Sequence, residues 1–258
     1  LFHVLRAGGM DPTLISGGID SALGSNAHAG GDDTVVLEAD ESDGSLVLFH
    51  PHSAVLTNLE EEHMGFYKNL NQIRRVFAQF ASHVQLPGCV AYSTDDKNLK
   101  ALAAAKKTAG VPVARFGLRS AAGVSAADIF LSSRGAGFDA VRDGNKLGSV
   151  ELQVPGIHNV SNALAAIAVG LNWGIPFRAL REGLAAFRGT MRRLELKAEI
   201  GGVRVLDDYA HHPTEVAASL GALMQGRKEG KIFVVFQPHR YSRVHHLAGE
   251  FARALCAA

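Results

Sequence analysis

Residues 34–45 read Thr-Val-Val-Leu-Glu-Ala-Asp-Glu-Ser-Asp-Gly-Ser, so a β-branched apolar run passes directly into four acidic side chains. A short apolar run of this composition predicts a buried strand of an α/β sheet. Carboxylates at the carboxyl end of such a strand lie where open sheets bind ligands, and their hard oxygen atoms suit Mg²⁺ held against nucleotide phosphates. A solvated acidic turn accounts for the same spacing equally well.

Apolar runs of the same kind recur along the chain and alternate with helical patterns, which is typical of βαβ units around a mostly parallel sheet. The predicted strands are 34–39, 54–58, 89–92, 111–116 and 129–132, the helices between them are 67–84 and 96–107, and the Ser/Gly/Asn-rich residues 21–31 are predicted as a surface loop. The turn sequence Asp-Gly-Asn at 143–145 predicts a β-hairpin, added after the sheet, from 139–142 and 147–154. Two helices are predicted next, at 158–173 and 177–187.

A change of pattern at residues 188–192 predicts a boundary between two domains. We expect residues 1–188 to form an α/β domain, with a mostly parallel sheet and flanking helices, and residues 189–258 to form the first part of a second, Rossmann-like α/β domain. The elements predicted there are strands 194–200, 203–208 and 232–236 and a helix at 213–223. Because 1–7 and 251–258 both read as interrupted helices, we expect the sequence to be an internal piece of a longer chain.

Composition limits the classes of function. The 258 residues are 47% hydrophobic and 20% charged, which suffices for one large domain or two smaller ones. The net charge is +1 with scattered Lys and Arg, and this pattern gives no indication of a nucleic-acid or membrane surface. Cys89 and Cys256 lack the spacing of a metal site, and no apolar run approaches the roughly 20 residues of a membrane span. We therefore expect a cytoplasmic protein that acts on small molecules.

Residues 57–63, Thr-Asn-Leu-Glu-Glu-Glu-His, again place polar groups directly after an apolar strand. As a neutral imidazole, His63 can ligate a metal or, as a donor, contact phosphate. The alternative is an ordinary helix N-terminal feature. Because two successive strands bring acidic or His side chains to one edge of the sheet, a ligand site is favoured.

Residues 156–163, Gly-Ile-His-Asn-Val-Ser-Asn-Ala, stand at a predicted helix start. Asn159 and Asn162 are three apart and so share a helix face. A side-chain amide offers both a donor and an acceptor, which matches the N6/N7 edge of adenine. The alternative makes one Asn a helix cap and the other a surface residue.

Two motifs in the second domain, at 207–215 and 237–243, each follow an apolar strand and precede a helix. Both are therefore expected to project polar side chains from one sheet edge. The paired Asp and His of the first motif can hold sugar hydroxyls or a substrate carboxylate, and Arg240 and Arg243 are predicted to share a helical face suited to an anion.

Four motifs together resemble the Mur ligase family, and the resemblance covers essentially the whole chain. They are Glu-Ala-Asp-Glu-Ser-Asp-Gly-Ser at 38–45, Gly-Ile-His-Asn-Val-Ser-Asn-Ala at 156–163, Asp-Asp-Tyr-Ala-His-His-Pro-Thr-Glu-Val at 207–216 and Gln-Pro-His-Arg-Tyr-Ser-Arg at 237–243. The resemblance implies an ATP- and Mg²⁺-dependent, amide-forming ligase of peptidoglycan precursor synthesis. The last two motifs are similar to those of the member that joins L-alanine to UDP-N-acetylmuramate through an acyl-phosphate.

The resemblance also implies roles for individual residues. It makes Glu38 and His63 the Mg²⁺ ligands, His158, Asn159 and Asn162 the adenine contacts, Arg193 the phosphate contact and Asp208 the ribose contact. It places Asn58, Tyr209, His211, His239, Arg240 and Arg243 around the amino acid and the acyl centre, and it assigns catalytic roles to Arg193, His211, His239, Arg240 and Arg243.

The sequence departs from the family pattern in three respects. It contains no G-x-x-x-x-G-K-[ST] loop, and Gly65 stands where an acidic residue is expected. The family's N-terminal UDP-binding domain and the end of its C-terminal domain are also expected to be missing from this piece. One alternative is a murein-peptide or cyanophycin-type ligase, which the 237–243 motif argues against. Another is a nucleotide-binding module without catalysis, which the missing phosphate loop favours.

Overall fold

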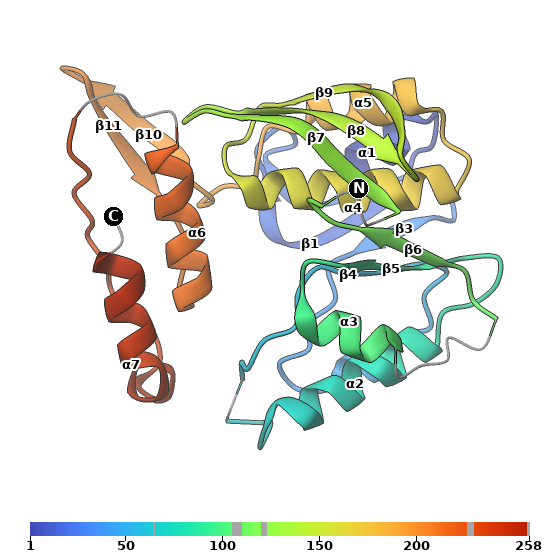
Figure 1. Cartoon of the computed structure of the whole chain (residues 1–258), viewed down its shortest axis with the longest axis horizontal. Helices are drawn as coiled ribbons and strands as arrows, with labels where there is room; N and C mark the ends of the chain where they lie inside the picture. The colour runs from blue at the N-terminus through green and yellow to red at the C-terminus, as the bar shows by residue number, and fades with distance from the viewer. Residues whose placement is uncertain (64, 105–109, 120–122, 226–229, 257–258) are drawn as a thin grey trace.

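The computed structural model describes residues 1–63, 65–104, 110–119, 123–225 and 230–256. Figure 1 shows a larger part, built on strands with helices on both sides, and a smaller part beside it that holds β10, β11, α6 and α7. We call the first the main part and the second the C-terminal part. The α/β class that the alternation of apolar runs predicts is confirmed.

The larger sheet of the main part has six strands in the order β4-β5-β6-β7-β8-β9. Their bounds are Ala54–Leu56, Val90–Ser93, Val113–Phe116, Val124–Leu131, Ala136–Arg142 and Asn145–Leu152. The first four are parallel, and β7, β8 and β9 form an antiparallel meander. The predicted hairpin is confirmed, and Asp143 and Gly144 at its turn both have positive φ, as a tight hairpin turn requires. The hairpin was predicted as an addition after the sheet, and that part of the prediction is wrong, because β8 and β9 are strands of the six-stranded sheet itself.

A second sheet has the order β2-β1-β3, with bounds Ser25–His28, Thr13–Asp20 and Val35–Leu37. The loop predicted at 21–31 is wrong in part, because β2 pairs antiparallel with β1 there. The sequence Ser-Asn-Ala-His has no strand-like alternation, so backbone pairing alone makes it a strand. The strand β1 was not predicted, and it contains Gly18, where a Cβ would lie 2.4 Å from Cγ2 of Thr190. That close approach explains a glycine within the strand, which weakens the strand pattern in the sequence.

Helices cover both faces of the main part (Figure 1). They are α1 Phe2–Ala7, α2 Leu70–Ser82, α3 Lys97–Ala104, α4 Ile157–Asn172 and α5 Phe177–Ala186, with a 3₁₀ turn, η1, at Ser45–Leu48. The helix α4 packs on β5 to β8 and also contacts α1 and α5, so its residues from Ala163 to Gly170 are all buried. A helix that is apolar all round is expected only in such a sandwiched position. Because α4 is packed on several sides, the position of its N-terminal turn, which forms part of the site described below, is fixed.

The C-terminal part consists of the antiparallel pair β10 Glu195–Ile200 and β11 Val203–Asp207, followed by α6 Pro213–Met224 and α7 Tyr241–Cys256. The strand predicted at 232–236 is wrong. In the described residues this segment has no ladder partner, and Phe233 and Val235 are 88% and 100% exposed. Apolar β-branched composition makes a strand only where a neighbouring strand pairs with it. Of the helix predicted at 96–107, residues 105–107 lie outside the described residues, as do 257 and 258 at the end of the helical pattern predicted at 251–258.

Candidate active site

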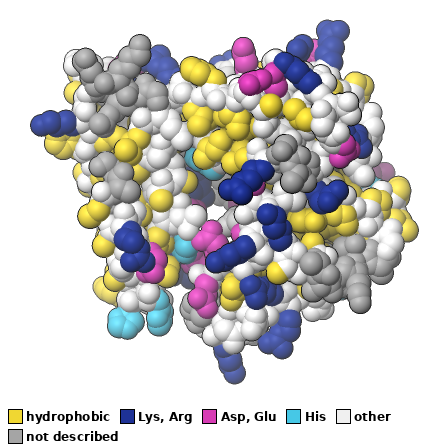
Figure 2. Space-filling model, viewed as in Figure 1, with side chains coloured by type: hydrophobic (Ala, Val, Ile, Leu, Met, Phe, Trp, Pro, Cys, Tyr) yellow, Lys and Arg dark blue, Asp and Glu magenta, His cyan; other side chains and the backbone are white. Residues whose placement is uncertain are grey.

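A cavity of about 2050 Å³ opens between the strand ends of the main part, the start of α4 and the C-terminal part. Figure 2 shows acidic, basic and histidine side chains along the border between the two parts. Nine residues predicted from sequence line this cavity: Glu38, Asn58, His63, His158, Asn159, Asn162, Arg193, Asp208 and His211. Tyr209, His239, Arg240 and Arg243 are not among its lining residues.

The first turn of α4 carries three of these residues in mutual contact. Nδ2 of Asn159 donates to the carbonyl of Pro155 at 2.7 Å, and Nδ2 of Asn162 donates to Oδ1 of Asn159 at 3.4 Å, so the two amides share a face as their spacing predicts. Burial lowers the pKa of His158, whose Nδ1 is buried without a partner among the described residues. A neutral, ordered imidazole and two amides can contact an uncharged, flat heterocycle.

The segment from Arg192 to Leu194 lies opposite His158 and is held by Asp208. Its two outer residues have positive φ, which is strained for non-glycine residues. The carboxylate of Asp208 accepts from the backbone N–H of Leu194 at 2.8 Å and from that of Ala210 at 2.7 Å. Nη1 of Arg193 lies 3.2 Å from Oε1 of Glu215, so Arg193 is paired with a carboxylate at the start of α6.

The helix α6 begins with a capping box. Nδ1 of His212 accepts from the N–H of Thr214, and Oε2 of Glu215 accepts from the N–H groups of His211 and His212 at 2.9 and 3.1 Å. Burial raises the pKa of Glu215, but the N–H of His211 and the charges of His211 and Arg193 outweigh it, so its pKa lies below the usual range. Glu215 is therefore an anion that orders three cavity residues.

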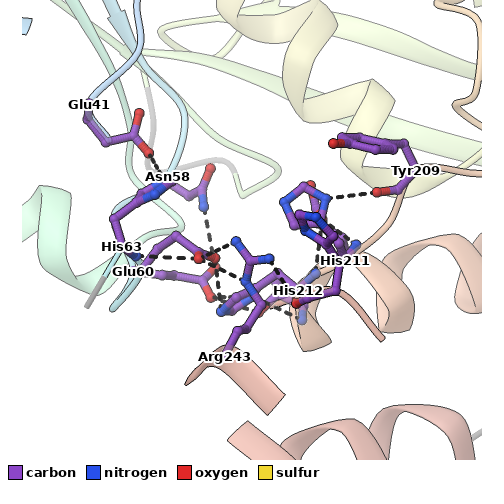
Figure 3. Close-up of polar contacts among 12 residues, drawn as sticks. Glu41, Asn58, Glu60, His63, Tyr209, His211, His212 and Arg243 are labelled. Atoms are coloured by element: carbon purple, nitrogen blue, oxygen red, sulfur yellow. Dashed lines mark hydrogen bonds and ion pairs between the residues drawn. The ribbon is translucent and has the colours of Figure 1, made fainter. Parts of the chain in front are cut away.

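Ion pairs join the two parts across the cavity mouth (Figure 3). Nη2 and Nε of Arg243 lie 2.7 and 3.0 Å from Oε1 of Glu62, and the hydroxyl of Thr214 donates to Glu60 at 2.7 Å. Nε2 of His212 is 3.7 Å from Oε2 of Glu62. Burial raises the pKa of Glu62, and the hydrogen bonds and charge of Arg243 lower it by more, so the carboxylate is ionised well below neutral pH.

The shared helical face predicted for Arg240 and Arg243 is wrong. Arg240 precedes α7, has φ +65° and is exposed, whereas Arg243 is in the helix, 8% exposed and paired with Glu62. The guanidinium of Arg243 thus already holds a carboxylate in this structure. Tyr209 is half exposed beneath the guanidinium of Arg192, 4.7 Å from the ring centroid.

The ring of His211 lies between two other aromatic side chains. Its centroid is 5.0 Å from that of Tyr209 and 6.5 Å from that of His239, and its Nδ1 lies 2.9 Å from the carbonyl oxygen of Tyr209. Of these three residues, only His211 reaches the cavity lining.

Two loops of the main part carry the proposed metal ligands. Oε2 of Glu38 accepts from the hydroxyl of Ser16 and the N–H of Gly17, both at 2.8 Å, and Nε2 of His63 lies 3.3 Å from Oε1 of Glu41. No cluster of three or more His, Cys, Asp or Glu suited to a metal occurs in the described part of the chain. The buried Nδ1 of His63 nevertheless has no partner there. A few protein ligands completed by water and phosphate suit Mg²⁺, so these residues fit that ion.

Comparison with known families identifies the architecture. The pattern of the Mur ligase middle domain matches residues 20–170, and that of the Mur ligase glutamate ligase domain matches residues 192–258. The chain belongs to the Mur ligase family. This membership confirms the resemblance drawn from the four motifs. Within the described residues, no helix combines the length and apolar character needed to cross a membrane.

Individual Mur ligases resemble the chain along nearly its whole length. The UDP-N-acetylmuramate–L-alanine ligase of Geobacter sp. (strain M21) is 42% identical over 252 residues, which are 97% of this chain and 54% of that protein. The enzyme of the same name from Salinibacter ruber is 43% identical over 249 residues, or 96% and 52%. The crystal structure of the UDP-N-acetylmuramate-alanine ligase MurC from Thermotoga maritima has a TM-score of 0.82 and 30% identity, over 99% of this chain and 55% of that one. The chain therefore spans about half the length of these relatives.

Sequence reasoning missed several residues that organise the site: Glu41, Glu60, Glu62, His212, Thr214 and Glu215. Each of these residues lies within a motif that the sequence analysis describes. The motif therefore indicated the right segment of the chain, but not which of its residues form the contacts. Which acidic residue of a run contacts which partner depends on the packing of the two parts.

Proposed function

We propose that this chain is part of an ATP-dependent ligase that joins L-alanine to the carboxylate of UDP-N-acetylmuramate in the cytoplasm, where ATP is available. The observation that carries the proposal is the single cavity onto which the α4 turn, the loops of Glu38 and His63, and the start of α6 converge. The two similar ligases named above support the choice of substrates. We also propose a domain boundary at 188/189, with the adenine site on the first domain.

The proposed reaction has two steps. The muramyl carboxylate attacks the γ-phosphorus of ATP, the bond to the ADP oxygen breaks, and an acyl-phosphate forms. The deprotonated amine of L-alanine then attacks the acyl carbon, and phosphate leaves with the electron pair as the amide forms. Mg²⁺ bound near Glu38 and His63 would neutralise charge on the transferring phosphoryl group.

The chain's own residues position the reactants in this proposal. His158, Asn159 and Asn162 hold adenine, Asp208 the ribose and Arg193 the phosphates. Asn58, Tyr209, His211, His239, Arg240 and Arg243 surround the amino acid and the acyl centre. Arg193 and Arg243 are both paired with carboxylates, Glu215 and Glu62, so each guanidinium is held in place before an anionic ligand arrives.

The proposal is tested with a chimera in which residues 1–258 replace the matching stretch of the Geobacter relative. Phosphate release is expected only when ATP, UDP-N-acetylmuramate and L-alanine are all present. Asn162→Ala in the chimera should weaken ATP binding and leave the affinity for UDP-N-acetylmuramate nearly unchanged, since an adenine-contacting amide touches only the nucleotide. A folded chimera that binds ADP but releases no phosphate with all three substrates would refute the ligase assignment.

The two alternative functions give different outcomes in the same assay. A murein-peptide ligase would release phosphate when the peptide L-alanyl-γ-D-glutamyl-meso-diaminopimelate replaces L-alanine. A solved ligase named for that peptide and a solved murein peptide ligase share 26% and 25% identity with this chain. A nucleotide-binding module would bind ADP in the chimera and turn over no substrate.

A further inference from the structure

We propose that Glu41 is a positioning residue that fixes the tautomer of His63, so that Nδ1 of His63 is the atom presented to a cation. The inference rests on the metal site of the proposed function and deepens it. Glu41 is in the acidic run after β3, and His63 is in the run after β4, so the contact joins the ends of two strands. Figure 3 shows the carboxylate of Glu41 directed at the His63 ring.

The first observation is the different environment of the two imidazole nitrogens. Nε2 lies 3.3 Å from Oε1 of Glu41, whereas Nδ1 is buried and has no partner in the described residues. A carboxylate beside Nε2 favours the tautomer that carries the proton there, which leaves the lone pair on Nδ1. A buried polar atom without a partner is costly, and a bound cation satisfies such a lone pair.

The second observation is the way that the two loops are tied together. The hydroxyl of Tyr67, a fully buried residue, donates to the backbone carbonyl of Glu41. The N–H groups of Phe66 and Tyr67 donate to the carbonyl of His63 at 2.8 and 3.0 Å. Tyr67 therefore holds the backbones of both Glu41 and His63, which fixes the separation of their side chains.

The third observation is the backbone of His63, whose φ is +56°. A non-glycine residue in the left-handed region is strained by about 1–3 kcal/mol and persists only where its surroundings impose it. The contacts of Tyr67 and Glu41 are those surroundings. This conformation turns the His63 ring toward Glu41, whereas the preceding residues Glu60 and Glu62 face the C-terminal part.

The test uses imidazole ¹⁵N NMR of the 258-residue chain, with the signals of His63 identified by their loss in His63→Gln. Wild-type His63 is expected to be protonated at Nε2. Glu41→Ala should abolish that preference, and Glu41→Gln, which keeps an acceptor, should retain part of it. Asp43→Asn is the matched control, since it removes a charge from the same loop and keeps the acceptor for the N–H of Ser45.

Mn²⁺ serves as the cation in a parallel titration. It should broaden the His63 signals, and Glu41→Ala should weaken Mn²⁺ binding by about tenfold or more while Asp43→Asn leaves it near the wild-type value. Protonation at Nδ1 in the wild type, an unchanged tautomer in Glu41→Ala, or the absence of Mn²⁺ broadening at His63 would each overturn the proposal. The NMR measurement of the tautomer needs no substrate. An inactive chimera would therefore refute the ligase assignment and leave the tautomer result valid.

Discussion

Removing the Arg243 guanidinium tests whether the contact with Glu62 holds the C-terminal part against the main part. In Arg243→Met the side chain keeps most of its apolar stem and loses two charge-assisted hydrogen bonds to one carboxylate oxygen. Arg253→Met is the matched control in the same helix, because Arg253 forms an exposed pair with Glu250 at 3.0 Å.

The expected magnitude follows from the burial of the two partners. Breaking a fully buried ion pair from one side costs about 3–5 kcal/mol. Here the side chain of Arg243 is 6% exposed, but that of Glu62 is 23% exposed, so water partly solvates the carboxylate that is left behind. We therefore expect Arg243→Met to lower the free energy of unfolding by about 2–3 kcal/mol. The exposed pair of Arg253 should contribute at most about 0.5 kcal/mol.

Urea denaturation followed by circular dichroism measures these free energies, and the fluorescence of Trp173 reports the main part alone. A double-mutant cycle with Glu62→Gln isolates the pair, and its coupling energy is expected to be about 1–2 kcal/mol. Because the pKa of folded Glu62 is below its ordinary value of 4.5, the pair stabilises above that pH and loses its effect as pH falls through the folded pKa. A coupling energy no larger than that of the Arg253 pair at pH 7 would refute this account.

Three further predictions address the core, the α4 turn and the thiols. Leu164→Ala, at a fully buried position of α4, should cost about 2–5 kcal/mol of unfolding free energy in urea denaturation, because it leaves a cavity in the main core. Gly156→Ala should cost more than about 1 kcal/mol and shift the His158 NMR signals, since φ is +97° there and a Cβ would lie 2.5 Å from Cε1 of His158. In a titration with Ellman's reagent, exposed Cys256 should react in the native chain and Cys89 only after unfolding, because burial both shields the Cys89 thiol and raises its pKa. Reaction of both thiols at one rate in the native chain would contradict the last expectation.

Local patterns predicted the elements whose sequence and environment agree. The long apolar run of α4 was placed within a residue at each end, and the Asp-Gly turn located the β8–β9 hairpin. Two predictions failed because a strand depends on a partner that is distant in the sequence. The strand β2 is polar, was predicted as a loop and exists through its pairing with β1, whereas 232–236 was predicted as a strand from its composition and has no ladder partner in the described residues.

The candidate site was partly predictable for a related reason. Glu38 and His63 do line one cavity, but the shared sheet edge predicted for them is wrong, because β3 and β4 belong to different sheets. Helix periodicity correctly paired Asn159 with Asn162. The pairing of Glu62 with Arg243 spans 181 positions in the sequence and depends on how the two parts pack, so no spacing rule reaches it.

The acidic run before His63 shows how one short segment serves both parts of the molecule. Glu60 and Glu62 contact Thr214 and Arg243 in the C-terminal part, whereas His63, the next residue, lies against Glu41 in the main part. The side chains of Glu60 and Glu62 are directed at the C-terminal part, and the side chain of His63 is directed at the main part. The left-handed backbone at His63 is the point where that direction changes, and Tyr67 stabilises it from the core. Two of the three consecutive glutamates, Glu60 and Glu62, therefore join the two parts of the molecule, in a run that the sequence suggested as a ligand site or a helix N-terminal feature.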